Sequence, residues 1–339
     1  MFKSKNIAFA LVASLSIGLL NNQAIACSRV LFNSTGNVVV GRTMDLYMPD
    51  HAKLMIYPRG VARNGGVPNS AKWNAKYGSV AVNSLDVGSS DGINEKGLVA
   101  NLLYLHESQY EKRDTRPGVS NAVIVQYLLD NAATVNEALA EIKKIQIVSI
   151  KASGREWPLH VSLSDEVGDS AVIEFIDGKM VIHHGPETAV MTNEPPLDWQ
   201  LNNLKNYKYF GGKESLPGDI DPASRFVRAS AFLKTSPVPK STQEALAQVF
   251  SITKTVSVPL GAHNTSTAIE SEDTWPTLWT TLADSKNRIY YFNASDSPNM
   301  VWVDLKKVDF SKGASIKSLS GEDSTISGDV TSKFQTLKK

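Results

Sequence analysis

Short β-rich runs joined by turn residues, with helical stretches grouped between them, most constrain the fold of this 339-residue chain. Residues 27–33 and 38–45 form a hairpin pattern around a polar turn, and similar patterns recur at residues 160–183 and 278–294. Strands do not alternate one by one with helices, which argues against a doubly wound parallel sheet. The sequence therefore predicts an α+β fold in which helices cover antiparallel sheets.

The remaining elements follow from periodicity and from capping residues. Thr134 followed by Glu137 is a capping box that opens a helix. The predicted strands are 73–82, 93–105 and 300–305, the first two joined by a polar Ser-Asp-Gly region, and the predicted helices are 119–130, 134–144, 222–234 and 242–250. Residues 27–339 read as one domain, with a loosely packed tail from about residue 311, where Ser, Gly and charged residues dominate.

The first 26 residues have the three parts of a secretory signal peptide. Lys3 and Lys5 precede an apolar run at 7–20, and Ala24-Ile25-Ala26 is a small-residue cleavage site. The apolar run is shorter than the roughly 20 residues that span a bilayer. We therefore expect cleavage between Ala26 and Cys27 and export to the periplasm or the medium, without stable insertion in the membrane.

The charge balance excludes some classes of partner. With 35 basic and 34 acidic residues the formal charge is +1, so no strong field favours nucleic acid or an anionic membrane. The six histidines show no metal-ligand spacing, because the adjacent His183 and His184 would point to opposite faces of a strand. We expect neither a metal nor another cofactor.

Cys27 is the only cysteine, and it directly follows the predicted cleavage site. An unpaired thiol in an exported protein needs an explanation. One explanation is a buried structural cysteine. A second is a lipid anchor, although that signal calls for a residue such as Leu where Ala24 stands. The third is catalytic, because cleavage leaves a thiol and an α-amine on the same residue.

The catalytic interpretation rests on ordinary acid–base chemistry. An α-amine titrates at about 7.7–8.0 and a thiol at about 8.5, so one residue can supply a base and a nucleophile. The hairpin brings Arg42 and Asp45 onto the strand beside Cys27. A cation stabilises a thiolate and a carboxylate can orient an amine. Without further context, an ordinary surface ion pair is the favoured interpretation of the two residues.

Five segments, in this order, resemble the choloylglycine hydrolase family, which groups bile salt hydrolases and penicillin V acylases among the N-terminal nucleophile hydrolases. They are Cys27 after its cleavage site, GRTMD at 41–45, DGINEKGL at 91–98, TNEPPLDWQLNNL at 192–204 and LPGDIDPASRF at 216–226. The resemblance implies a four-layer αββα sandwich with two antiparallel sheets between helix layers. It also implies hydrolysis of linear, non-peptide amide bonds.

The resemblance assigns a role to each matching residue. Cys27 corresponds to the nucleophile and Arg42 to the arginine beside its thiol. Asp45 corresponds to the aspartate that holds the α-amine. Asn193 corresponds to the asparagine whose side-chain N–H points into the oxyanion hole, and Arg225 to a second arginine of the active centre.

Two departures from bile salt hydrolases bear on the substrate. Tyr104 stands at a position where bile salt hydrolases carry an asparagine. A tyrosine here is similar to the penicillin V acylase branch, and its backbone N–H can still serve the oxyanion hole. The stretch 206–215 is shorter than in relatives, where a longer insertion packs around a neighbouring subunit. We expect a homo-oligomer, and the sequence leaves open whether it is a tetramer. An apolar acyl pocket is predicted from Met44, Met48, Leu103, Tyr104 and Leu105, which serve equally well as core.

These observations predict an amidohydrolase acting on a small acyl amide with an apolar acyl group, such as phenoxyacetyl or a fatty chain. An N-acyl homoserine lactone is a reasonable natural substrate within this class. Bile salt hydrolysis is the alternative among enzymes. A lipid-anchored binding protein, attached through Cys27, is the alternative from another class.

Overall fold

The computed structural model describes residues 27–152, 154–262 and 275–337, and the predicted signal peptide lies outside them. Its first element is the predicted hairpin, formed by β1 (Ser28–Ser34) and β2 (Asn37–Asp45). The turn residues Thr35 and Gly36 have φ of 50° and 78°, as a tight two-residue hairpin requires. This hairpin carries Cys27, which immediately precedes β1.

The hairpin lies in a seven-stranded sheet, here the first sheet, with strand order β16-β1-β2-β17-β18-β19-β21. Its strands pair antiparallel except for β19 with β21. The further strands are β16 (Val190–Thr192), β17 (Thr277–Asp284), β18 (Ile289–Ala294), β19 (Val301–Asp304) and β21 (Gly328–Asp329).

The second sheet has nine strands in the order β15-β14-β13-β8-β7-β6-β3-β20-β22. Its strands are β3 (Lys53–Tyr57), β6 (Ser79–Ser84), β7 (Gly88–Asn94), β8 (Val99–Tyr104), β13 (Leu159–Ser164), β14 (Ser170–Ile176), β15 (Lys179–His184), β20 (Lys317–Ser320) and β22 (Gln335–Thr336). Three short pairs lie outside the two sheets: β4 (Ala62–Asn64) with β5 (Lys72–Asn74), β9 (Gly118–Ser120) with β10 (Gln146–Val148), and β11 (Lys151–Ala152) with β12 (Arg155–Glu156).

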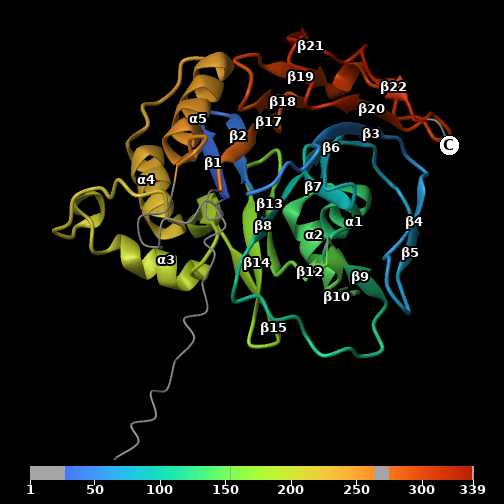
Figure 1. Cartoon of the computed structure of the whole chain (residues 1–339), viewed down its shortest axis with the longest axis horizontal. Helices are drawn as coiled ribbons and strands as arrows, with labels where there is room; N and C mark the ends of the chain where they lie inside the picture. The colour runs from blue at the N-terminus through green and yellow to red at the C-terminus, as the bar shows by residue number, and fades with distance from the viewer. Residues whose placement is uncertain (1–26, 153, 263–274, 338–339) are drawn as a thin grey trace, which may run out of the picture.

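Helices cover the outer face of each sheet (Figure 1). On the second sheet lie α1 (Ile124–Asn131) and α2 (Val135–Ile142), the latter opened by the predicted capping box, in which Thr134 accepts the Glu137 N–H. The first sheet is covered by α4 (Pro222–Thr235) and α5 (Thr242–Val256), with α3 (Leu197–Leu204) beside α4.

Gly41 in β2 lets α5 pack closely on the first sheet. A Cβ at this position would lie 2.6 Å from Cγ2 of Thr253 and 2.7 Å from Cγ1 of Val249, closer than carbon atoms approach. The glycine of the GRTMD segment is therefore explained by helix packing rather than by chemistry at the site.

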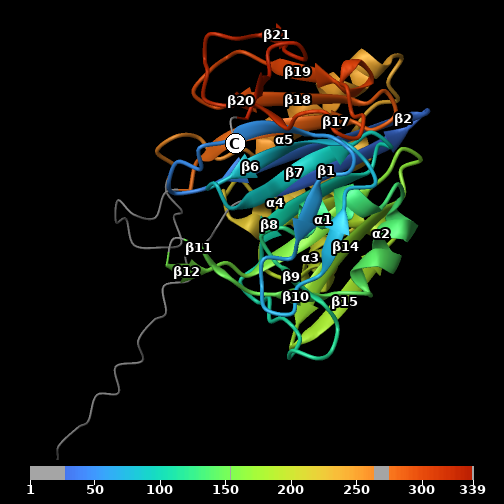
Figure 2. The ribbon, with the colours of Figure 1, turned by 90° about the vertical axis from the view of Figure 1, so that its right-hand side faces the viewer.

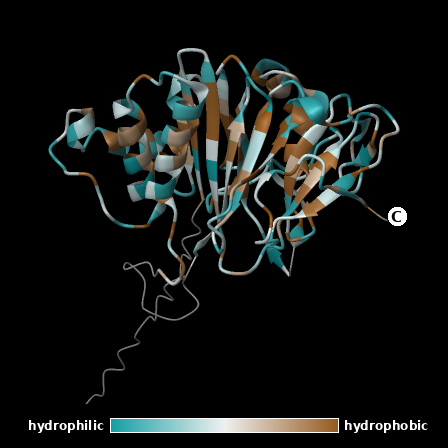
Figure 3. Ribbon diagram, turned by 90° about the horizontal axis from the view of Figure 1, so that it is seen from above, coloured by the Kyte–Doolittle hydropathy of each residue, from teal (hydrophilic) through white to brown (hydrophobic). Residues whose placement is uncertain are grey.

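A continuous apolar core joins the inner faces of the two sheets, and apolar segments run along the central strands (Figure 3). It combines residues of the first sheet, such as Val30, Val40 and Trp279, with residues of the second, such as Val82 and Leu103. A second apolar cluster fills the space under α1 and α2. The predicted α+β class and the αββα layering are confirmed.

The predicted strands between residues 73 and 105 are wrong in their boundaries. The polar Ser-Asp-Gly region, expected to be a connection, is strand β7 itself. Its serines and Asp91 are buried and hydrogen-bonded to neighbouring side chains, for example Asp91 to Asn101 (2.6 Å). Satisfied polar groups are tolerated in a core, so this strand carries no apolar alternation that a sequence pattern could detect.

The predicted loosely packed tail is also wrong. Strand β20 pairs with β3 in the second sheet, and Figure 2 shows the C-terminal strands lying along one edge of the fold. Phe310, Val330 and Phe334 belong to the central core. A few apolar anchors fix the segment although most of its residues are polar.

We expect Phe334→Ala to lower the free energy of unfolding by about 3 kcal/mol, because it removes a buried aromatic side chain. Urea denaturation followed by tryptophan fluorescence measures this change. Leu337→Ala is the matched control, because Leu337 is 44% exposed and its truncation should change stability by less than about 0.5 kcal/mol. Equal midpoints for the two variants would mean that the tail does not stabilise the fold.

Candidate active site

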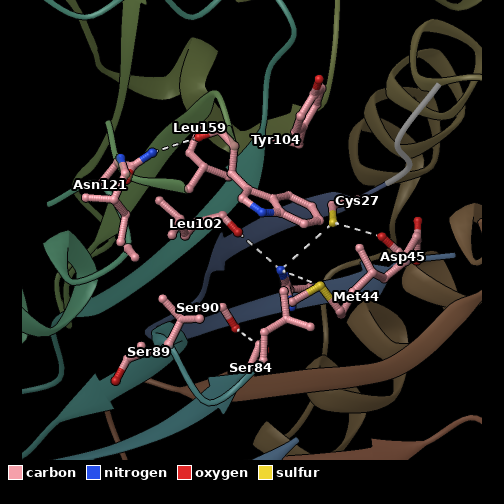
Figure 4. A pocket seen from close by; sticks show the side chains of 18 residues that line it. Cys27, Met44, Asp45, Ser84, Ser89, Ser90, Leu102, Tyr104, Asn121 and Leu159 are labelled. Carbon is pink, nitrogen blue, oxygen red and sulfur yellow. Dashed lines mark hydrogen bonds between the residues drawn. The ribbon is translucent and has the colours of Figure 1, made fainter. Parts of the chain in front are cut away.

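Cys27 lies at the head of β1, and its side chain is buried between the two sheets. Its sulfur lies 3.9 Å from Nη2 of Arg42 and 3.8 Å from the carbonyl oxygen of Asp45 (Figure 4). Cys27, Arg42 and Asp45, predicted to lie together from the hairpin alone, are therefore in contact.

Three further groups hold the Arg42 guanidinium beside the sulfur. Nη2 donates to the Leu102 carbonyl oxygen at 3.1 Å and lies 3.3 Å from the sulfur of Met44. The guanidinium also stacks over the Trp279 ring, 4.4 Å from its centroid. Both sheets thus contribute to the position of this charge.

Arg42 counters the effect of burial on the thiol. Burial raises the pKa of Cys27 because a thiolate loses its hydration, and Asp45 adds to this effect. Arg42 is the largest influence in the other direction, and it lowers the pKa of Cys27. A reactive thiolate in this position therefore depends on Arg42.

Asp45 is a fully buried carboxylate with one unused oxygen. Its Oδ1 accepts the Thr277 hydroxyl at 2.6 Å, and its Oδ2 lies 3.6 Å from Nη1 of Arg225. Within the described part of the chain, Oδ2 accepts no hydrogen bond. Burial raises the pKa of Asp45 to about 7, against the opposing effects of Arg225 and Thr277.

Arg225 projects from the first turn of α4 and joins the ends of several strands. Its Nη1 donates to the Cys27 carbonyl oxygen at 2.9 Å and to the Ser28 hydroxyl at 2.6 Å. Its Nη2 donates to Oδ1 of Asn193 at 3.3 Å. Asp221 caps this helix, with its side chain accepting the Ser224 N–H, and so fixes the turn that carries Arg225.

Asn193 follows β16, and its side chain contacts Cys27 through the amide oxygen. Its Oδ1 accepts the Cys27 backbone N–H, and its Nδ2 donates to the Tyr104 carbonyl oxygen at 2.8 Å. An amide nitrogen carries two hydrogens, so one N–H of Asn193 remains for another acceptor.

Strand β8 turns polar backbone groups toward the site because its pairing with β7 ends at Asn101. The Leu105 N–H donates to the Pro158 carbonyl oxygen, which orients alternate residues of β8 toward β13. Leu102 and Tyr104 therefore present their backbone groups on the opposite side. Their carbonyl oxygens accept from Arg42 and Asn193, and the Tyr104 N–H lies on that same side.

A largely apolar pocket opens beside Cys27, with an empty volume of about 720 Å³ that includes its mouth (Figure 4). The predicted residues Met44 and Tyr104 line it. Of the other predicted residues, Met48 packs in an apolar cluster next to the pocket, and Leu103 and Leu105 are buried, the core alternative that the sequence left open. The other apolar walls are Leu46, Leu85, Val87, Leu102, Ala122, Ile150, Trp157 and Leu159.

Sequence reasoning missed several residues of the site. Thr277, which pairs with Asp45 across β17 and β2, is far from it along the chain, and no spacing links the two. Ser84 and Ser90 line the pocket, but they were assigned to a polar connection rather than to strands.

A buried acidic group holds the segment that follows Asn193. Both oxygens of Glu174 accept the Leu197 N–H, at 3.0 and 3.3 Å, where α3 begins. His160 and His183 flank the carboxylate at 3.5 and 3.3 Å. Burial raises the pKa of Glu174, but the histidines and the Leu197 N–H outweigh it and hold the pKa at about 2.

No helix in the described ranges is both long and apolar enough to cross a bilayer. No group of three or more potential metal ligands gathers among the same residues.

Residues 27–320 match the family described as linear amide C-N hydrolases, choloylglycine hydrolase family. The chain belongs to this family. A penicillin V acylase of Pectobacterium atrosepticum is 38% identical over 365 aligned positions, which cover 98% of this chain and 95% of that protein. A bile salt hydrolase/transferase of Clostridium perfringens is 28% identical, covering 79% of this chain and 88% of that protein.

A solved structure extends the similarity to the fold. The penicillin V acylase from Agrobacterium tumefaciens superposes with a TM-score of 0.83 at 40% identity, covering 92% of this chain and 98% of that one. The resemblance inferred from the five segments is confirmed. This member of the choloylglycine hydrolase family is an enzyme of the linear amide C-N hydrolase class, similar to penicillin V acylases.

We expect Glu174→Gln to flatten the acid limb of the stability curve. The pKa of Glu174 is lowered from 4.5 to about 2, so its stabilisation is complete above about pH 4.5 and is lost as the pH falls toward 2. Between pH 5 and 6 the variant should be less stable by about 2 kcal/mol, and the difference should shrink in acid. Glu187→Gln, at an exposed residue of the 3-10 turn after β15, is the control. A difference in the free energy of unfolding that stays constant from pH 6 to pH 2 would contradict the lowered pKa of Glu174.

Proposed function

We propose that this enzyme hydrolyses linear amides of apolar acyl groups, with Cys27 as the nucleophile after cleavage between Ala26 and Cys27. One observation carries the proposal: the buried Cys27 sulfur lies 3.9 Å from the Arg42 guanidinium and faces an apolar pocket. The family match, which starts at residue 27, supports a mature chain that begins with this cysteine.

The surroundings of the Cys27 nitrogen support a catalytic α-amine. A peptide nitrogen is not basic, whereas the amine produced by cleavage can take and return a proton. The Cys27 nitrogen already donates to Asn193, and Oδ2 of the nearby Asp45 accepts no hydrogen bond from the described residues. An ammonium group has three donors, and Asp45 offers an acceptor and a compensating charge for one of them.

The proposed reaction follows from these positions. The Cys27 thiol gives its proton to the α-amine, and the sulfur attacks the amide carbon. The oxyanion is stabilised by the Tyr104 backbone N–H and by the second N–H of the Asn193 side chain. The α-amine then protonates the leaving amine, and a thioester remains on Cys27. Water hydrolyses the thioester with the α-amine as base.

The apolar pocket and the similarity to a penicillin V acylase support a preference for apolar acyl groups. The relative with 38% identity is a penicillin V acylase, and an apolar pocket suits a phenoxyacetyl group. A fatty acyl chain suits the same walls, so N-acyl homoserine lactones are a second proposed substrate. Bile salt hydrolysis is the alternative, disfavoured because Tyr104 lines the pocket where bile salt hydrolases carry an asparagine.

Export to the periplasm and assembly as a homo-oligomer complete the proposal. Export is supported by the three-part N-terminal sequence, and it supplies the cleavage that frees Cys27. The opposing hypothesis is a binding protein that is lipid-anchored through Cys27. A lipidated sulfur is a thioether, which cannot ionise to the thiolate nucleophile, so the two hypotheses exclude one another.

The mature N-terminus is the decisive measurement. Intact mass spectrometry of the exported protein should give the mass of residues 27–339 with a free cysteine, and this protein should hydrolyse penicillin V. A diacylglycerol adduct on Cys27 would sink the enzymatic proposal. Cys27→Ser should lower kcat by at least a thousandfold at neutral pH, because a hydroxyl is far less ionised than a thiol. Unchanged turnover by a correctly processed Cys27→Ser protein would refute the nucleophile.

Asn193→Ala tests the proposed oxyanion donor. Loss of one such donor typically lowers kcat by a factor of about 10² to 10³. We expect a loss of this size in kcat with a smaller change in KM, measured with penicillin V. Asn202→Ala is the matched control, because Asn202 lies exposed on α3 and contacts only Lys205 among its described hydrogen-bond partners. A loss confined to KM would assign Asn193 to substrate binding instead.

A further inference from the structure

Two serine hydroxyls face the acyl pocket away from Cys27 (Figure 4). Ser84 is the last residue of β6 and Ser90 lies in β7, and their oxygens are 2.8 Å apart. Both side chains are nearly buried, at 9% and 8% exposure. Polar groups in an otherwise apolar pocket fix the orientation of a ligand, and the proposed amidase mechanism makes no use of these two.

A β-bulge turns Ser90 toward the pocket. The register between β6 and β7 shifts here: Asn83 pairs with Ser89 and Val82 pairs with Asp91, which leaves Ser90 as the extra residue. Ser89 bonds Gln126 of α1 on the outer face, while Asp91 bonds Tyr290 on the inner face. The bulge therefore allows two successive side chains, Ser90 and Asp91, to lie on the inner side of the sheet.

The hydrogen of each serine is already used within the protein. Ser84 donates to Oδ2 of Asp50 at 2.9 Å, and the same oxygen accepts the Trp279 indole N–H at 2.8 Å. Ser90 must then donate to Ser84, or to the Val82 carbonyl oxygen at 3.4 Å. A hydroxyl has one hydrogen and two lone pairs, so in either arrangement Ser90 offers the pocket only acceptor positions.

Two other polar residues of the pocket, Asn121 and Ser89, already form hydrogen bonds within the protein. Asn121 donates to the Trp157 carbonyl oxygen at 2.7 Å and accepts the Ile150 N–H at 3.2 Å. These bonds hold the segment that carries β11 and β12 against the pocket. Ser89 donates away from the pocket, as described above. Ser90, supported by Ser84 and Asp50, is therefore a group that can select a polar substituent of the acyl chain.

We propose that Ser84 and Ser90 form an acceptor subsite for a hydroxyl or another neutral hydrogen-bond donor on the acyl group. The inference rests on the proposed amide hydrolysis and narrows its substrate class to acyl groups substituted away from the scissile bond. An ether or a ketone at the same place offers only acceptors, so it gains nothing there. A carboxylate or a sulfonate is disfavoured, because its charge would face the serine lone pairs with the buried Asp50 behind them.

A set of matched substrates tests the subsite in the mature enzyme. Amides of one amine with phenoxyacetyl, hydroxyphenoxyacetyl and methoxyphenoxyacetyl groups, substituted in turn at the meta and para positions, vary the donor at nearly constant shape. At the position that reaches Ser90, the hydroxylated amide should have a kcat/KM about threefold to tenfold above the unsubstituted one, as one neutral hydrogen bond provides. The methyl ether should show no such gain. A methyl ether as good as the phenol at both positions overturns the proposal.

Two variants assign the preference to Ser90. In Ser90→Ala the ratio of hydroxylated to unsubstituted kcat/KM should fall to about one. In Ser89→Ala the ratio should remain as in the wild type, because Ser89 bonds Gln126 instead. A preference that survives in Ser90→Ala contradicts the assignment to this residue.

Product inhibition keeps the test independent of the variants. If Ser90→Ala does not fold, wild-type inhibition by hydroxyphenoxyacetate should still be threefold to tenfold stronger than inhibition by phenoxyacetate. Equal inhibition by the two acids would overturn the subsite while leaving the amidase proposal intact. Hydrolysis of none of these amides would instead overturn the proposed function, and the subsite with it.

Discussion

The contact between the Arg42 guanidinium and the Cys27 sulfur is the interaction on which the rest of the site depends. Desolvation favours the neutral form of a thiol buried between two sheets, and the charge of Arg42 is the largest of the influences that oppose this. That cation is itself costly to bury, and it is stabilised by the Leu102 carbonyl oxygen and by the Trp279 ring. The layer between the two sheets is therefore the apolar core of the fold and also the place where the charge beside the Cys27 sulfur is held.

The site forms where side chains of the first sheet and its following loop are hydrogen-bonded to the backbone of the second sheet. Strand β8 extends beyond its partner β7, and the backbone groups released there are satisfied by Arg42 and Asn193 of the first sheet and its following loop. These bonds fix Leu102 and Tyr104 relative to the residues that surround Cys27. The same arrangement leaves the Tyr104 N–H facing the place where an oxyanion would form.

Local sequence could predict what the hairpin alone determines. Cys27, Arg42 and Asp45 lie on two strands joined by a short turn, so their proximity follows from strand pairing. Asn193 and Arg225 contact Cys27 across 166 and 198 residues of chain, and only the family resemblance connects them. Strand β7 and the C-terminal tail were misread for a common reason, since buried hydrogen-bonded polar residues and a few isolated apolar anchors leave no periodic pattern. Only Met44 and Tyr104 of the five predicted pocket residues line the cavity, because the alternation of apolar residues along a strand cannot distinguish a cavity wall from a packed core.

Asp45 links maturation to the electrostatics of the fold. Its pKa is raised from 3.8 to about 7, so the folded state favours the protonated acid. The folded-state pKa exceeds the unfolded one, and this carboxyl therefore makes folding less favourable as the pH rises from about 4 to 7. In the proposed mature enzyme a protonated α-amine of Cys27 would lower the pKa of Asp45 and offset part of that loss. Cleavage would thus supply the catalytic base and a second cationic group, besides Arg225, that can offset the burial of this carboxyl when the amine is protonated.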